Sequence, residues 1–66
     1  MKVDVLKIKS IMLYNQVTQA DLAESLGMSN NTLRLRFSNP ERFSFEEMNE
    51  IIKILKIENP SDVFFA

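Results

Sequence analysis

The chain has 66 residues, of which 45% are hydrophobic, and its eight Lys or Arg against nine Asp or Glu give a formal charge of −1. It contains a single Gly and neither Cys nor His, which excludes zinc fingers, haem attachment, disulfides, thiol or imidazole catalysis and glycine-rich phosphate loops, and leaves only carboxylates as candidate metal ligands. A chain this short forms one domain, residues 1–66, close to the lower size limit for folding alone, and self-association is a common remedy.

Residues 3–14 predict an amphipathic helix. Apolar side chains recur there at helical spacing, and these are Val5, Ile8, Ile11 and Met12. Leu6 and Leu13 lie off that stripe, seven residues apart. Two apolar faces on one short helix indicate either that both are buried within the domain or that one makes a second contact. Because a chain of this size has little core, we favour burial of both faces.

A second helix is predicted over residues 19–26. Thr18 is a good N-cap, and Asp21 places negative charge in the first turn, where the backbone N–H groups are exposed. The inward face consists of Leu22, Ala23 and Leu26. Gly27 ends the helix, because glycine adopts the left-handed conformation at little cost.

A third helix follows directly, with Ser29 or Asn30 as its N-cap. It ends at Ser38-Asn39-Pro40, because the residue before a proline is forced out of helical geometry. Its apolar or semi-apolar members are Thr32, Leu33, Leu35 and Phe37, and its charged members are Arg34 and Arg36.

Two more helices are predicted after Pro40. Ser44 and Glu47 form a capping box that begins a helix from Phe45 to about Lys56, with an inward stripe of Phe45, Met48, Ile51, Ile52 and Leu55. Asn59 and Pro60 then match the N-cap and first position of a short final helix that carries Val63, Phe64 and Phe65. We interpret the cluster of Phe43, Phe45, Phe64 and Phe65 as core rather than interface. No stretch alternates with period two, so the predicted fold is all-α with five helices.

Residues 19–38 have the spacing of two helices that cross at a tight turn. Such a turn needs a small side chain at the crossing, supplied by Ala23, and a residue that tolerates positive φ, supplied by Gly27. The apolar residues that would anchor both helices are Leu22, Leu26, Met28, Leu33 and Phe37.

This segment resembles the helix-turn-helix of phage repressor and Cro-type regulators, a class that includes the xenobiotic-response-element-like regulators. The matching residues are Thr18-Gln19, Leu22-Ala23, Leu26-Gly27-Met28-Ser29, Leu33 and the loop from Asn39 to Ser44. The resemblance implies a compact lambda-repressor-like DNA-binding domain with the motif in its second and third helices. One position departs from the pattern: Arg36 stands where the family commonly has an apolar residue. Either the third helix is rotated, or Phe37 takes over the packing role.

The resemblance further implies that residues 29–38 enter a DNA major groove. The base-contacting candidates are Ser29, Asn30, Asn31, Arg34 and Leu35, because Asn pairs with adenine, Arg with guanine, and Leu contacts the thymine methyl. The phosphate-contacting candidates are Thr18, Gln19, Arg36, Ser38, Asn39 and Arg42. Gln19 is also placed to brace Asn30. The simpler alternatives are that the two asparagines only cap the helix, that the arginines form a solvated face, and that Gln19 is an ordinary surface residue.

These features imply a bacterial or phage transcriptional regulator, Cro-like or a repressor, that binds an operator without catalysis, metal, cofactor or small-molecule ligand. A homodimer on a pseudo-palindromic double-stranded site is expected. The candidate dimer surfaces are the segment 57–65 and the Leu6/Leu13 stripe. The alternative is a helix-turn-helix protein that modulates another regulator, such as an antirepressor. No membrane segment or signal peptide is evident, so we expect a soluble, cytoplasmic and nucleoid-associated protein.

The charge is unevenly distributed along the chain. Residues 1–42 carry six basic and four acidic side chains, whereas residues 43–66 carry two basic and five acidic ones. The acidic excess therefore lies away from the helix expected to face DNA. We expect few phosphate contacts per subunit and weak non-specific affinity, which makes dimerisation a functional need.

Overall fold

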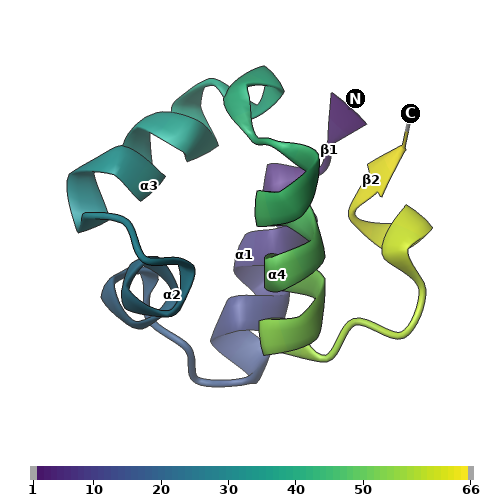
Figure 1. Cartoon of the computed structure of the whole chain (residues 1–66). Coiled ribbons are helices and arrows are strands. Elements are labelled where there is room, and N and C mark those ends of the chain that lie inside the picture. The colour runs from purple at the N-terminus through teal and green to yellow at the C-terminus, as the bar shows by residue number, and fades with distance from the viewer. Residues whose placement is uncertain (1, 66) are drawn as a thin grey trace.

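The computed structural model describes residues 2–65, and the side chains of residues 2–64. Its helices are α1 (Val5–Tyr14), α2 (Gln19–Leu26), α3 (Asn30–Ser38) and α4 (Phe45–Leu55), with the 3-10 turns η1 (Pro40–Arg42) and η2 (Pro60–Asp62). Two short strands, β1 (Lys2–Val3) and β2 (Phe64–Phe65), pair in antiparallel register. In Figure 1, α2 and α3 lie on one side of α4, and the C-terminal segment lies on the other side. The helix-turn-helix is thus separated from the chain ends by the central helices.

The C-terminal segment differs from the sequence-based expectation. Residues 2–65 contain four α-helices rather than five, and a small sheet replaces the all-α prediction. Asn59 does begin a turn as expected, since its side-chain oxygen accepts a hydrogen bond from the Ser61 N–H at 3.3 Å. The turn stops after Asp62, because the backbone of Val63 and Phe64 is bonded to the N-terminal segment instead. The N–H of Asp4 donates to the Val63 carbonyl at 2.7 Å, and Val3 pairs with Phe64.

The helix boundaries follow local capping interactions. Helix α1 begins at Val5 rather than at residue 3, because the Asp4 carboxylate accepts from the Lys7 N–H at 3.0 Å and so acts as the N-cap. Helix α2 has the predicted bounds, and Gly27 after it has a φ of 71°. Helix α4 begins at Phe45 after the predicted Ser44 capping box. The sequence therefore predicted the middle of the chain well.

The core is a single cluster of apolar side chains. All four α-helices contribute to it, as do the residues that follow the two 3-10 turns, Phe43 after η1 and Val63 after η2. Its buried members are Ile8, Met12, Leu22, Ala23, Leu33, Phe37, Phe43, Met48, Ile51, Leu55 and Val63. The expected phenylalanine core is only partly formed: Phe43 is buried, whereas Phe45 is 60% exposed and meets Phe64 edge to face at a centroid distance of 6.0 Å. The Phe65 side chain lies outside the described residues.

Helix α1 buries only one of its two apolar faces. Ile8 and Met12 lie in the core, but Leu6 is 81% exposed and Leu13 is 82% exposed. Our preferred interpretation, that both faces are buried within the domain, was wrong. The remaining helices all gather on the Ile8 side, and nothing within residues 2–64 covers the other face of α1.

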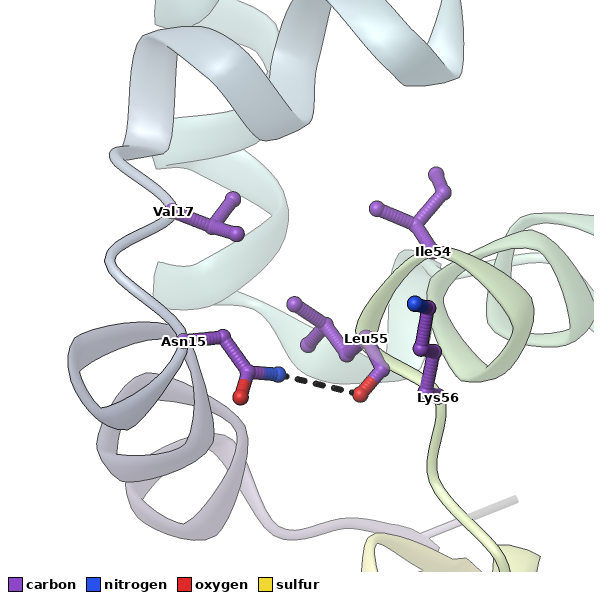
Figure 2. Close-up of a pocket in the computed structure, with 5 residues that line it drawn as sticks. All are labelled: Asn15, Val17, Ile54, Leu55 and Lys56. Atoms are coloured by element: carbon purple, nitrogen blue, oxygen red, sulfur yellow. Dashed lines mark hydrogen bonds between the residues drawn. The ribbon is translucent and has the colours of Figure 1, made fainter.

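A side-chain hydrogen bond ties the end of α1 to the end of α4. Figure 2 shows Asn15 facing Leu55, and the Asn15 amide nitrogen donates to the Leu55 carbonyl oxygen at 3.1 Å. Val17, which follows in the same turn, lines the same shallow pocket together with Ile54 and Lys56. This bond satisfies a carbonyl that the last turn of α4 leaves unpaired, and it holds α1 and α4 as one frame. Sequence reasoning had assigned no role to Asn15.

Candidate nucleic-acid interface

Helices α2 and α3 are joined by the tight turn that the sequence predicted. The Met28 N–H donates to the Ala23 carbonyl at 3.0 Å, which closes the turn around left-handed Gly27. Leu22 and Ala23 of α2 and Leu33 of α3 are buried at the crossing. The side of α3 opposite Leu33 is exposed to solvent, and it presents Asn30, Asn31, Arg34, Leu35 and Ser38.

Ser29 caps α3. Its hydroxyl oxygen accepts from the Thr32 N–H at 3.0 Å and donates to the Thr32 hydroxyl at 2.8 Å. Neither Asn30 nor Asn31 is the N-cap of α3. The alternative interpretation, that these two asparagines only cap the helix, was therefore wrong. Their amides stand at the exposed start of the helix, where backbone N–H groups also favour an anion.

Gln19 braces Asn30, as the sequence suggested. The Gln19 amide nitrogen donates to the Asn30 side-chain oxygen at 2.9 Å, so the first residue of α2 holds the first residue of α3. Asn30 keeps its own NH₂ group free of protein acceptors in these contacts, because the bond uses only its oxygen. The half-buried Gln19 is therefore more than an ordinary surface residue.

Asn31 and Arg34 are bonded to each other one turn apart. The Asn31 side-chain oxygen accepts from Arg34 Nη2 at 2.9 Å and from Arg34 Nε at 3.2 Å. This pair restricts the long Arg34 side chain before any ligand arrives and leaves Nη1 unengaged. Leu35 beside it is 45% exposed and adds an apolar contact to an otherwise polar surface.

Arg36 is turned towards α4. Its Nε lies 3.2 Å from Glu47 Oε1, and its Nη2 donates to Glu47 Oε2 at 3.4 Å. Phe37 fills the apolar position that Arg36 vacates: it is 8% exposed and meets Phe43 edge to face at 5.9 Å. Of the two interpretations of the Arg36 departure, the structure supports the packing role of Phe37. A phosphate would have to compete with Glu47 for this guanidinium.

Glu47 has two functions at once. Its Oε1 accepts from the Ser44 N–H at 2.9 Å in the capping box, while both carboxylate oxygens face Arg36. Partial burial acts to raise the pKa of the Glu47 carboxyl, but the bonds from Arg36 and Ser44 outweigh burial and hold this pKa below its ordinary value of 4.5. The sequence showed the capping box and missed the link to α3. The available signal was an arginine at a normally apolar position.

The other phosphate-contacting candidates stand at two ends of the motif. Thr18 caps α2: its hydroxyl accepts from the Asp21 N–H at 3.1 Å, and its N–H donates to the Asp21 carboxylate. Hydrogen bonding to the Asp21 carboxyl from the Thr18 side chain and from the Thr18 backbone N–H holds the pKa of this carboxyl below its ordinary value of 3.8. Ser38 is the exposed last residue of α3, and Asn39 and Arg42 are exposed beyond its end. Glu41 lies among them in a shallow depression, where its charge opposes an approaching phosphate.

Among residues 2–64, no group of three or more Asp and Glu side chains is placed to hold a metal ion. No described helix is long and apolar enough to cross a membrane.

Comparison with known proteins identifies the family. A model of the Cro/C1-type HTH DNA-binding domain matches residues 7–64, which is most of the chain and covers α1 from Lys7 onward and all of α2, α3 and α4. No curated protein and no solved structure gave a match. The family match and the capped, tightly turned α2–α3 pair agree on the same segment. The chain therefore belongs to the family of Cro/C1-type helix-turn-helix DNA-binding domains.

Proposed function

We propose that the protein is a sequence-specific transcriptional regulator of a bacterium or phage that places α3 in the major groove of an operator. The observation that carries the proposal is the ordered polar surface at the start of α3. Two side-chain pairs, Gln19 with Asn30 and Asn31 with Arg34, are bonded there in the free protein. Ordered side chains lose less conformational freedom on binding, which favours a specific contact over a non-specific one.

The chemistry of these side chains defines what α3 would recognise. An asparagine amide can donate to adenine N7 and accept from N6, and an arginine can donate to O6 and N7 of guanine. Leu35 offers an apolar contact to a thymine methyl. Ser29 stands beside them at the N-cap, and we assign the five residues Ser29, Asn30, Asn31, Arg34 and Leu35 to base contacts.

Phosphate contacts would come from both ends of the motif. Thr18 and Gln19 stand at the start of α2, Ser38 ends α3, and Asn39 and Arg42 follow it. Arg36 contributes only if it leaves Glu47, so we expect its share to be small. With so few free cations, one subunit binds DNA weakly, and a homodimer on two half-sites one helical turn apart, about 34 Å, is expected.

Selection of binding sites from random duplex DNA tests this function directly. We expect an enriched pseudo-palindromic sequence. The logarithm of its binding constant should fall linearly with log[salt], with a slope of about −0.9 for each neutralised phosphate. Enrichment of no sequence, together with no duplex binding at low salt, would overturn the proposal. It would favour the alternative of a helix-turn-helix protein that binds another regulator.

Two arginine variants separate base contacts from phosphate contacts on the selected site. Arg34→Ala should cost about 1–3 kcal/mol and relax preference at one base position. Arg42→Ala, the matched control, should weaken all sequences alike and reduce the salt slope by about 1. Equal losses on every sequence for Arg34→Ala would refute its base-contacting role.

A further inference from the structure

The outer face of α1 carries three large apolar side chains in water. Leu6 is 81% exposed, Leu13 is 82% exposed and Tyr14 is 88% exposed, and together with Ser10 they form what we call the outer α1 face. Single exposed leucines are ordinary, but three large exposed apolar side chains on one ten-residue helix are a local concentration of apolar surface. None of these residues belongs to α2 or α3, so the patch is separate from the proposed DNA surface.

The spacing on this face is symmetric. Leu6 and Leu13 are seven residues apart, two helical turns, and therefore point to the same side of α1. Ser10 lies near the midpoint between them and is small and exposed. If two such helices pack antiparallel, each Leu6 meets a Leu13 and the two serines face each other at the axis. A small residue at that point allows the helices to approach closely.

The surface beside the outer α1 face carries charges of both signs, so that two copies of the chain could pair opposite charges. A groove next to Tyr14 is lined by Lys7 of α1 and Lys56 on one hand and by Glu58 and Asp62 of the C-terminal segment on the other. A two-fold axis repeats both signs on both copies, so cations of one copy can meet anions of the other. Lys9, on the opposite flank, has its ammonium 5.3 Å from the Phe37 ring centroid, which draws this charge towards α3.

We propose that a second copy of this chain covers the outer α1 face, with α1 antiparallel to α1 of the partner about a two-fold axis near Ser10. The inference rests on the proposed function, which calls for two recognition helices, and it names the surface that joins them. A ten-residue helix is about 15 Å long, so the contact falls below the roughly 1,200 Å² of a small stable interface. The free dimer is therefore weak and is completed on DNA.

A single cysteine tests the axis, because the chain has no native Cys. With helix axes about 8–10 Å apart, facing Cα atoms come within the range of about 4.4–6.8 Å that a disulfide needs. Ser10→Cys should form a covalent dimer under mild oxidation, at a rate at least tenfold that of Ser25→Cys. Ser25 is the matched control, since it is also an exposed helical serine, on α2. Equal rates for the two variants would overturn the proposal.

A charge substitution tests the same surface without covalent cross-linking. By sedimentation equilibrium the wild type should self-associate, and Leu13→Glu should raise the dimer Kd at least tenfold. Asn49→Glu, at an exposed site on α4, should leave this Kd unchanged. A wild type that stays monomeric at millimolar concentration would assign the face to a different partner and refute the proposal. Since Leu13 is exposed, circular dichroism should show the variant folded.

DNA binding separates failure of this inference from failure of the proposed function. The Leu13→Glu variant should still bind a duplex with one half-site as the wild type does, and should lose affinity only for the duplex with two. If both duplexes lose affinity equally, the outer α1 face is not the dimer surface, although the regulator function stands. If neither protein binds any duplex, the proposed function fails, while the cysteine and sedimentation results still decide the dimer.

Discussion

Helices α2 and α4 both begin with a capping box, but the two boxes differ in what else they contact. In α2 the Thr18 hydroxyl and the Asp21 carboxylate exchange hydrogen bonds with each other's backbone, and both residues are exposed. In α4 Ser44 and Glu47 do the same, but both are half-buried, and the Glu47 carboxylate also binds Arg36 of α3. One capping box serves only its own helix, whereas the other also links α4 to α3 through Arg36.

The difference arises from what lies next to each helix start. The start of α2 faces solvent and, in the proposed complex, phosphate. The start of α4 faces the last turn of α3, where Arg36 stands in place of an apolar residue. A carboxylate that already serves as a capping residue thereby gains a cationic partner. The free-energy contributions of the two boxes should differ accordingly.

Removing Glu47 should have the largest effect on stability. Glu47→Ala deletes the reciprocal cap and leaves the half-buried Arg36 guanidinium without its acceptor, so the free energy of unfolding should fall by about 2 kcal/mol. Urea denaturation at pH 7 measures this loss. Glu46→Ala, at the exposed neighbouring position, is the control, and a loss no larger than in that variant would contradict the dual role.

Removing the capping box of α2 should lower the free energy of unfolding by a smaller amount. Thr18→Ala deletes one N-cap hydrogen bond at an exposed site, and the expected loss is about 1 kcal/mol by the same denaturation experiment. Thr18→Ser keeps the hydroxyl and should retain most of the stability. A loss equal to that of Glu47→Ala would mean that the two boxes are equivalent after all.

A double-mutant cycle isolates the link between α3 and α4. Arg36→Met keeps the apolar stem, and Glu47→Gln keeps an acceptor for the Ser44 N–H, so their coupling energy reports mainly the ion pair. We expect about 0.5–1 kcal/mol, as for a partly exposed pair. Arg36→Met combined with Asp21→Asn should show no coupling, because these side chains share no hydrogen bond. Coupling in that control cycle would indicate a general effect of charge.

The smallest effect is a difference in acid sensitivity. Because the folded protein holds the pKa of Glu47 below 4.5, its stabilising contribution is complete above that pH and is lost as the pH falls through the lowered value. Glu47→Gln cannot be protonated, so its melting temperature should fall less steeply than that of the wild type below pH 4.5. Asp21→Asn should flatten the curve only at lower pH, since the ordinary pKa there is 3.8. Identical melting curves for all three proteins would contradict a role of the lowered Glu47 and Asp21 pKa values in acid sensitivity.

Much of the fold was predictable because its signals are local. Capping residues and Gly27 act within one or two turns, so the bounds of α2 and the start of α4 followed from neighbouring residues alone. The C-terminal segment was predicted incorrectly, because Asn59 and Pro60 begin a helix and a 3-10 turn equally well. Pairing with β1, at the other end of the chain, decided between them.

The candidate site shows the same division. The exposed side of α3 and the Gln19 brace were inferred from the sequence, because a helix-turn-helix repeats one geometry in many proteins. The Arg36–Glu47 pair and the Asn15–Leu55 bond were not, since each joins residues from different helices whose approach no local pattern reveals. The same limit explains the error on Leu6 and Leu13, whose spacing is equally suited to burial and to exposure.

Residue spacing alone was enough to predict the family, the helix-turn-helix and the side chains that the third helix presents, because all three depend on a segment of about twenty residues. Three further outcomes depend on packing between distant segments: which apolar face of α1 enters the core, what Arg36 binds, and the pairing of residues 2–3 with residues 64–65 as strands. Those outcomes depend on which surfaces meet once the helices are packed around Leu22, Leu33 and Ile51. The small core takes up only the face of α1 that carries Ile8 and Met12, and Leu6 and Leu13 on the other face stay exposed.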